Sequence, residues 1–262
     1  MARGVTDSRH YENIADAIRD SSFGYIEGPI PPSQMAGCIE EISEVAHQEG
    51  IQSQYDRFWD AYQANGSRTG YIAGFAGTGW TAEIFHPKYD IVAANAYNMF
   101  YNFSYQVPIN LKQLLTEGGI TLTFPKCANI SGLFDTSGIT DIGELDFSTA
   151  TRLNCTALFN YCLLLKSIEK IILPVGQTTF NQWFRNCPAL ENVTFEGTIN
   201  ANDFNVSWST ELTHGSLMSI INCLADNSGA GTAWTVTFGA ENLAKLTDAE
   251  KAMATEKGWT LA

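Results

Sequence analysis

Two stretches of the chain, FNYCLLLKSIEKIILP (residues 159–174) and FRNCPALENVTFEG (residues 184–197), carry almost the same pattern. Each begins with phenylalanine, has a cysteine three residues later, and ends in a short run in which apolar and polar residues alternate. The two phenylalanines are 25 residues apart. A pattern that recurs at such an interval indicates a structural repeat, because each copy must offer the same apolar side chains to its neighbours.

The pattern extends towards the N-terminus and the C-terminus. An apolar residue followed by phenylalanine also occurs at Phe100 and Phe134, so that four copies follow one another at intervals of 34, 25 and 25 residues. The segment INLKQLLTEGG, residues 109–119, accounts for the longer first interval as an insertion. Alternating runs typical of short strands accompany the copies and end the series: ITLTF (120–124), ELDF (144–147), KIIL (170–173), NVTF (192–195) and WTVTF (234–238).

A period of about 20–29 residues with one strand in each copy is typical of a leucine-rich-repeat solenoid. The sequence therefore predicts an α/β repeat fold, a solenoid with one short strand per repeat, with an N-terminal helical module and a C-terminal helical cap. The expected regions are a docking or oligomerisation module (1–50), an aromatic- and glycine-rich N-terminal cap (51–93), the solenoid (94–238) and a capping helix (239–262).

Helices are expected at both ends of the chain. Residues 6–20 and 31–48 place apolar side chains at helical spacing, but two helices this short cannot bury their apolar faces alone. They must pack on the next domain, on a partner or on copies of themselves, and these alternatives stay open. Near the C-terminus, Thr247 and Glu250 have the spacing of a capping box, and Gly258 is placed to end the helix.

The chain is acidic. Its 262 residues include 28 acidic and 15 basic side chains, which give a net charge of −13, so nucleic acid is not an expected partner. No apolar run approaches the roughly 18–20 residues of a spanning helix, and membrane insertion is not expected either. The first 20 residues lack the apolar core of a secretory signal, which argues against export by that route.

The residues that could carry chemistry are scattered along the chain. Six cysteines form no C-x-x-C motif, so we expect free thiols, which act within the repeats as small buried apolar groups. The four histidines lack ligand spacing, and no metal or other cofactor is expected. Asp141, Glu144 and Asp146 lie around one predicted strand and could suit a glycosidase, but acidic surface residues are more often simply solvated. The sequence predicts that the protein is not an enzyme.

The repeats resemble a known group of proteins. LFNYC with LKSIEKIILP, and WFRNCPALENVTFEGTI, resemble the BspA-type (Treponema-type) leucine-rich repeats of bacterial surface proteins, whose pattern is F-x-x-C-x-x-L-x-x-I followed by a strand. The first two copies depart from it, because Phe103 and Ser137 stand where the cysteine is expected. YENIADAIRD and PPSQMAGCIEEI near the start, and TVTFGAENLAKLTDAEKAMATEKGWTLA at the end, are similar to tail-associated proteins encoded by phages and prophages of gut bacteria. The resemblance implies a binding role in a virion or at a cell surface, and no chemistry.

We therefore expect a non-enzymatic, tail-associated phage virion protein that recognises a host-surface protein or glycan through the repeat surface. Contacts with other tail proteins, and homo-oligomerisation through the N-terminal helices, would multiply weak binding. The expected location is the virion tail, with the bacterial cell surface as the alternative. Two other functions stay open: a structural tail or baseplate component without a receptor role, and a bacterial surface adhesin.

Two surfaces are candidates for binding. Alternation along the predicted strands points one set of side chains outward as a ladder that could hydrogen-bond a sugar or a protein, although threonine also suits a plain solvated strand. These residues are Thr121, Thr123, Asp146, Ile172, Thr194, Glu196, Thr235 and Thr237. A second set lies in the turns, where binding residues often concentrate, whereas Trp183 is expected in the core. The turn residues are Tyr101, Asn102, Asp135, Asn160, Tyr161, Arg185 and Trp208.

Overall fold

A computed structural model describes residues 90–176, 178–201 and 204–262 of the chain. All of these residues belong to one compact unit. The predicted N-terminal module (1–50) and residues 51–89 of the predicted cap lie outside the described residues. The oligomerisation expected through the N-terminal helices therefore stays a prediction.

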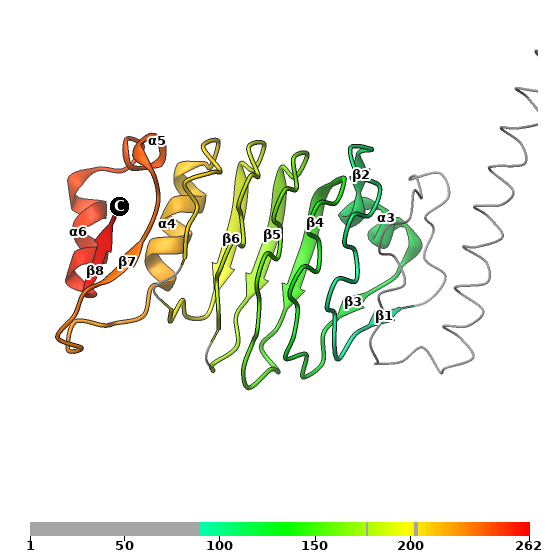
Figure 1. The fold of residues 1–262 in the computed structure, drawn as a ribbon, viewed down its shortest axis with the longest axis horizontal. Helices are drawn as coiled ribbons and strands as arrows, with labels where there is room; N and C mark the ends of the chain where they lie inside the picture. The colour runs from blue at the N-terminus through cyan, green and yellow to red at the C-terminus, as the bar shows by residue number, and fades with distance from the viewer. Residues whose placement is uncertain (1–89, 177, 202–203) are drawn as a thin grey trace, which may run out of the picture. The chain divides into compact units, whose positions relative to one another are not determined.

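A sheet of four parallel strands lies at the centre of this unit (Figure 1). Leu145, Ile171 and Phe195 are paired directly across three of the strands, and all three side chains are buried. This row lines the core because successive side chains of a strand point to opposite faces of the sheet. The strands, in spatial order, are β2 (Ile109–Asn110), β4 (Ile139–Asp146), β5 (Ser167–Ile172) and β6 (Asn192–Glu196).

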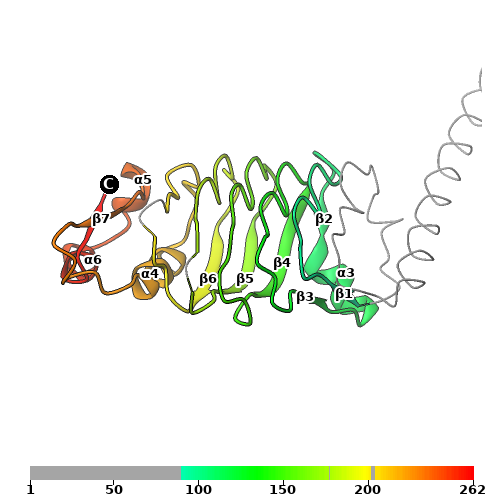
Figure 2. The same cartoon turned by 60° about the horizontal axis from the view of Figure 1, so that its bottom comes forward.

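Two further pairs of parallel strands and four helices complete the described residues. Two views of the unit show the same order, with α3 at one end of the central sheet and α4 beside β6 at the other (Figure 1, Figure 2). None of the described helices is both long enough and apolar enough to cross a membrane. The smaller sheets pair β1 (Ile91–Val92) with β3 (Leu122–Thr123) and β7 (Trp234–Val236) with β8 (Trp259–Leu261). The helices are α3 (Leu111–Gly118), α4 (His214–Cys223), α5 (Ala240–Leu243) and α6 (Asp248–Glu256).

The predicted fold class, a leucine-rich-repeat solenoid with one short strand per repeat, is wrong. The described residues form a mixed α/β fold, in which the parallel strands belong to three separate sheets and are accompanied by four helices. Two of the five predicted strand runs leave the expected ladder, because β3 pairs with β1 and β7 pairs with β8. The physical reason is similar at both places. A helix takes the position of the expected strand: α3 interrupts the chain between β2 and β3, and α4 packs against β6.

The C-terminal cap agrees with its prediction in part. The Thr247 side chain accepts from the backbone of Glu250, and the Glu250 carboxylate accepts from the backbone N–H of Thr247, so the capping box of α6 is confirmed. After the helix, Gly258 has a φ of 79°, and a Cβ there would lie 2.7 Å from the backbone of Asn227. Glycine is therefore required at this turn. The cap also contains β8, a strand that the sequence pattern did not predict.

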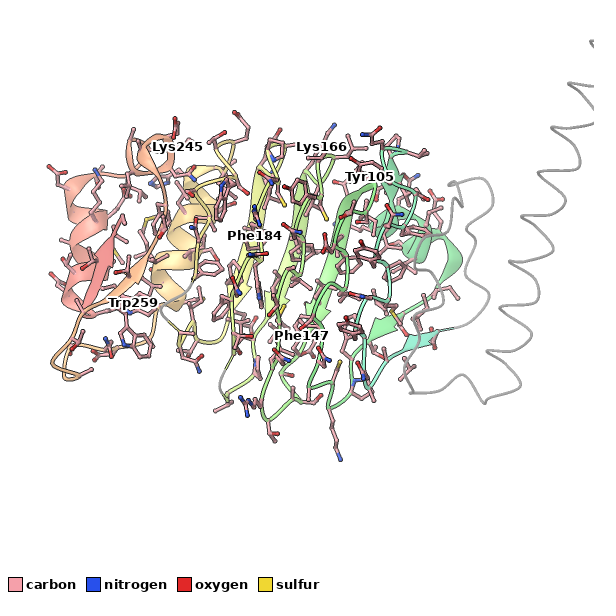
Figure 3. The ribbon with its side chains drawn as sticks, in the orientation of Figure 1. Tyr105, Phe147, Lys166, Phe184, Lys245 and Trp259 are labelled. Atoms are coloured by element: carbon pink, nitrogen blue, oxygen red, sulfur yellow. The ribbon has the colours of Figure 1, made fainter. Side chains whose placement is uncertain are left out.

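The four phenylalanines that define the repeat form one stack in the core. Ring centroids are 5.3 Å apart between Phe100 and Phe134, 5.5 Å between Phe134 and Phe159, and 5.3 Å between Phe159 and Phe184. All four rings are fully buried, and Figure 3 labels Phe184, the last of them. Stacked pairs of this kind add about 0.5–1.5 kcal/mol to the free energy gained by burial. Each ring thus packs on the ring of the neighbouring copy, which explains why phenylalanine recurs.

The turns around these rings pair their backbone groups both within a copy and between copies. The N–H of Phe159 donates to the oxygen of Trp183 in the next turn at 2.8 Å, and the N–H of Cys162 donates to the oxygen of Phe159 at 3.1 Å. Buried backbone therefore has partners although it is neither helix nor strand. The second residue after each phenylalanine adopts a left-handed backbone, with φ between 52° and 59°; these residues are Asn102, Thr136, Tyr161 and Asn186.

The repeated cysteine is a hydrogen-bond donor as well as a small buried group. The thiols of Cys162 and Cys187 each donate to the backbone oxygen of the phenylalanine one copy earlier, with Sγ–O distances of 2.9 and 2.8 Å. Ser209 makes the corresponding bond in the following turn, at 3.4 Å. Burial raises the pKa of Cys162 to about 12 and the pKa of Cys187 well above its ordinary value, so both thiols keep the proton that they donate. Cys127, Cys162, Cys187 and Cys223 are free thiols, as predicted.

Candidate functional site

A groove lies between α3 and the second half of β4. Its volume is about 500 Å³, and it is lined by one face of α3, by residues 120–125 around β3 and by residues 142–146 of β4. We call it the α3 groove. Ligand-binding cavities commonly have volumes of about 300–1,000 Å³, so the groove is large enough for a small ligand or for a short segment of peptide.

The ends of α3 are set by residues that suit helix caps. The Oδ1 atom of Asn110 accepts from the N–H of Gln113 at 2.8 Å, and Gly119 ends the helix with a left-handed φ of 62°. Leu111, the first helical residue, is buried. The chain therefore leaves the central sheet directly after β2. The sequence pattern had identified this segment only as an insertion.

This helix interrupts the hydrogen-bonded ladder on one side of β4. Strand β2 pairs only with the start of β4, with Ile109 opposite Ile139 and Asn110 opposite Asp141. After α3 the chain returns as β3, which pairs with β1. Within the part of the chain that the structure describes, residues 142–146 thus have β5 on one side and no paired strand on the other. The α3 groove occupies this gap.

The walls of the α3 groove carry apolar and acidic side chains in alternation. Ile142 and Leu145 belong to the buried core, and β3 adds the half-buried Leu122. Glu144 and Asp146, which flank Leu145 on β4, are exposed. The groove is therefore apolar towards the core and acidic towards solvent.

Charged side chains continue from the groove across the outer face of the central sheet. The Nζ atom of Lys170 on β5 lies 3.4 Å from Glu144 Oε2 on β4 and 3.4 Å from Glu196 Oε2 on β6. Hydrogen bonds to Glu196 and Glu144 raise the pKa of Lys170. Lys112 on α3 is 3.1 Å from Glu169 Oε2. These side chains are largely exposed, and such ion pairs contribute little to stability.

The other carboxylates of β4 are held by neutral donors. The Oδ1 atom of Asp146 accepts from the N–H of Ser148 at 2.8 Å, and no described cation forms a salt bridge with Asp146. Asp141 accepts from the hydroxyls of Ser167 at 2.7 Å and Thr140 at 2.8 Å. Asp146 is thus the carboxylate of the groove that is most available to a cationic ligand. No group of three His, Cys, Asp or Glu side chains among the described residues could hold a metal ion.

The structure brings part of the predicted strand ladder together. Asp146, Ile172 and Glu196 lie opposite one another in register across β4, β5 and β6. Thr121 and Thr123 are exposed and line the α3 groove together with Asp146. Five of the eight predicted ladder residues therefore surround one hollow or its continuation on the sheet.

Thr194 lies in a second hollow, of about 460 Å³, between β6 and α4. There the helix closes the edge of the sheet, because Ser216 Oγ accepts from the N–H of Val193 at 2.9 Å and Ser219 Oγ accepts from the N–H of Phe195 at 2.7 Å. Residues three apart lie on one side of a helix, so both hydroxyls face β6. Sequence analysis missed this role, although two serines at that spacing in an apolar helix were a usable signal.

The last two predicted ladder residues, Thr235 and Thr237, do not belong to the central sheet. Thr235 lies in β7, where it is paired with Thr260 of β8. Thr237 forms an isolated parallel bridge with Asn205. Because α4 follows β6 in space, the central sheet ends before these two threonines are reached.

Four of the predicted turn residues, from three neighbouring turns, lie next to one another. The Nδ2 atom of Asn160 donates to Asp135 Oδ1 at 3.1 Å, and the guanidinium carbon of Arg185 lies 5.8 Å from the centre of the Tyr161 ring. Burial raises the pKa of Asp135. These contacts join side chains of neighbouring turns into one surface.

The remaining turn residues lie on either side of that group. Tyr101 and Asn102 are one turn earlier, and the N–H of Asn102 donates to Asp135 O at 2.8 Å. The side chains of Tyr101 and Trp208 are 42% and 40% exposed. Trp183 is fully buried, as predicted.

Comparisons with known proteins give no relative from which the site could be interpreted. No protein-family model, no curated protein and no solved structure matches this chain. The α3 groove is therefore interpreted from its own geometry and chemistry.

Proposed function

We propose that this protein is a non-enzymatic binding protein, which recognises a protein or glycan on a host-cell surface through the α3 groove and the adjoining outer face of β4, β5 and β6. The observation that carries the proposal is the groove of about 500 Å³, whose walls combine buried aliphatic side chains with exposed threonines and carboxylates. A cavity with apolar walls and a few polar groups that fix orientation is the usual form of a binding site.

The packing of the residues that line the groove supports this interpretation. The β4 residues that line it include Ile142 and Leu145, which are buried in the core. The ring of Phe124, at the end of β3, packs 5.0 Å from the ring of Phe147, at the end of β4. Figure 3 shows Phe147 at the edge where β4 ends. Side chains carried by a well-packed strand hold their positions better than side chains on loops, which favours selective binding.

The arrangement of carboxylates favours binding over hydrolysis. A glycosidase needs one protonated carboxyl and one ionised carboxylate on either side of a bond. Glu144 is instead paired with Lys170, and Asp141 is held by two hydroxyls. Both carboxylates are thus already bonded by neighbouring side chains and do not form a pair placed on either side of a substrate bond.

The location rests on the resemblance of the repeats and of both chain ends to surface and tail-associated proteins. We place the protein on a phage tail, with the bacterial cell surface as the alternative. Other tail proteins are then proposed partners, and several copies on one particle would multiply weak binding.

The proposal is tested with purified, fluorescently labelled full-length protein on a panel of intact gut bacteria. The double variant Glu144→Gln, Asp146→Asn changes the groove, and the double variant Glu211→Gln, Glu241→Gln removes the same charge from exposed positions elsewhere. We expect the wild type and the control to bind at least one strain, and the groove variant to bind about tenfold more weakly. Equal binding by both variants would contradict the proposal. A chain that binds no cells but joins purified tail proteins would indicate the structural role instead.

A further inference from the structure

The edge of β4 that faces the α3 groove has the geometry of an unpaired strand edge. Along a parallel strand, a residue directs both its N–H and its C=O to one neighbouring strand, and the next residue directs them to the other. The N–H of Phe147 donates to Ile172 O on β5. By alternation the backbone groups of Leu145 also face β5, and those of Glu144 and Asp146 face the groove.

No described strand pairs with that edge. The β2–β4 pairing ends at Asn110 and Asp141, and β3 belongs to another sheet. Unpaired strand edges are templates for the addition of a further strand, and several families of binding domains use them to hold extended peptides. Residues of α3 line the opposite side of the groove from this edge.

The side chains of the groove match the alternation of an extended peptide. Successive side chains of a strand point to opposite faces, so every second residue of an added strand would point to the side of Leu145 and the half-buried Leu122, and the others to the side of Glu144 and Asp146. The first set suits aliphatic residues and the second suits lysine or arginine.

Charge and the absence of an exposed ring select a peptide over a sugar. Asp146 forms no salt bridge with a described cation, Glu144 shares Lys170 with Glu196, and the whole chain has a net charge of −13. Among the described residues that line the groove, Phe124 is the only aromatic one, and its 2% exposure offers no face on which a sugar ring could stack. A basic ligand is therefore favoured by electrostatics and a glycan lacks its usual platform.

We infer that the α3 groove binds an extended segment of a partner protein in which lysine or arginine alternates with aliphatic residues, and that this segment adds a parallel or antiparallel strand to β4. The inference rests on the proposed binding function and deepens it by naming the class of ligand. Backbone hydrogen bonds to Glu144 and Asp146 supply part of the affinity, and the two rows of side chains supply the selectivity.

Gly143 offers a way to block the groove without disturbing the core. A Cβ at Gly143 would meet only the Cγ atom of Lys112, at 3.8 Å, and Gly143 lines the groove, so a larger side chain at this position takes up groove volume. Gly229 is a matched control, because a Cβ there meets nothing within 4 Å and the residue lies outside the groove. Unfolding midpoints show whether each variant is folded, and the double variant Glu144→Gln, Asp146→Asn tests the same site if Gly143→Val is not.

The probe is the acetylated and amidated heptapeptide KLKVKLK, titrated into the full-length chain by calorimetry. Its controls are KKLVLKK, which has the same composition without the alternation, and KLKVKLK with N-methyl groups on alternate residues, in either phase, which removes backbone donors. We expect KKLVLKK and the peptide methylated in the phase whose N–H groups face β4 to bind at least about tenfold more weakly than the probe, and the peptide methylated in the other phase to bind like the probe. We expect Gly143→Val to weaken probe binding by a similar factor and Gly229→Val to leave it unchanged.

The outcomes separate this inference from the proposed function. If bacteria bind the protein through the groove but KLKVKLK does not bind at about 1 mM, the ligand class is wrong and the binding function stands. Equal affinity for KLKVKLK and KKLVLKK would reduce the effect to charge attraction, and equal affinity for the N-methylated peptides would exclude strand addition. Failure of both cell binding and peptide binding would overturn both proposals.

Discussion

The central sheet ends against a helix on each side. The two helices differ in whether their side chains hydrogen-bond the backbone of the strand beside them. On the β6 side, the hydroxyls of Ser216 and Ser219 accept hydrogen bonds from the N–H groups of Val193 and Phe195. Ser216 also donates to the backbone oxygen of Glu191 at 3.0 Å. The two serines thus bond alternate backbone groups of β6, as a neighbouring strand would, and α4 closes the edge.

On the β4 side, α3 offers no comparable bonds. Its hydroxyl residue on the groove, Thr116, donates to the oxygen of Lys112 in the same helix at 2.8 Å. The helix therefore covers the edge of β4 without pairing with it. The comparison teaches that a helix can replace a strand only where its side chains bond the strand's backbone at the strand's own spacing. Where they do not, the backbone groups of the strand edge stay without a partner strand.

The largest effect on the free energy of unfolding is expected from a substitution in the core that supports both edges of the sheet. Phe159 lies in the middle of the ring stack, 5.5 Å from Phe134 and 5.3 Å from Phe184. Phe159→Ala should lower the free energy of unfolding by about 3–5 kcal/mol, because it leaves a cavity between two rings. Urea unfolding measures this change, with the exposed Tyr101→Ala as control. A loss of about 1 kcal/mol or less would contradict the role of the stack.

A smaller effect is expected from opening the closed edge. Ser216→Ala with Ser219→Ala leaves the N–H groups of Val193 and Phe195 without their partners, which should cost about 2–4 kcal/mol for the pair of groups. The amides of Val193 and Phe195 should also exchange with solvent faster. Thr255→Ala is the matched control, because that hydroxyl bonds only a carbonyl of its own helix. Unchanged exchange at β6 in the double variant would refute the comparison of the two edges.

A smaller effect again is expected from the repeated thiols of the turns, those of Cys162 and Cys187. Cys187→Ala removes the bond to Phe159 O and should cost about 1 kcal/mol of unfolding free energy. Cys187→Ser should cost less, because Ser209 makes the corresponding bond in the next turn. Chemical denaturation of both variants gives the two values. If serine destabilises as much as alanine, the thiol acts only by filling space.

The smallest effect concerns the link between α4 and α6. His214 Nε2 lies 2.8 Å from Glu250 Oε1, and the backbone N–H of Thr247 holds the pKa of Glu250 below its ordinary value of 4.5. A carboxyl whose pKa is lowered by folding adds stability above its unfolded pKa, and this stability is lost as the pH falls through its folded pKa. Unfolding midpoints from about pH 6 to pH 3 should therefore fall less steeply for Glu250→Gln than for Glu241→Gln. Parallel curves would show that Glu250 adds no pH-dependent stability.

The sequence pattern predicted local features of the fold well. Alternation placed Asp146, Ile172 and Thr194 on the outer face of the sheet, which leaves Leu145, Ile171 and Val193 on the inner face, and these last three are buried. It could not predict the partner of each strand, because alternation is a property of one strand and pairing depends on the path of the chain between strands. The run that contains β3 has the same alternation as the others, yet α3 separates it from the expected ladder.

The candidate site was predicted in part for the same reason. Thr121, Thr123 and Asp146 line the α3 groove, and each was identified from its outward position on a strand. Lys112 and Gly143 were missed, because nothing in a strand pattern indicates that an inserted helix will cover a strand edge. A helical pattern inside an otherwise regular repeat is the signal that points to such a groove.

The central claim is that the edge of β4 is open and the edge of β6 is closed, and amide hydrogen exchange followed residue by residue tests it most directly. We predict that the amides of Val193 and Phe195 are protected in the free protein, that those of Glu144 and Asp146 exchange much faster, and that KLKVKLK slows exchange at Glu144 and Asp146 alone. Equal protection of all four amides in the free protein, or no change on adding the peptide, would contradict the account.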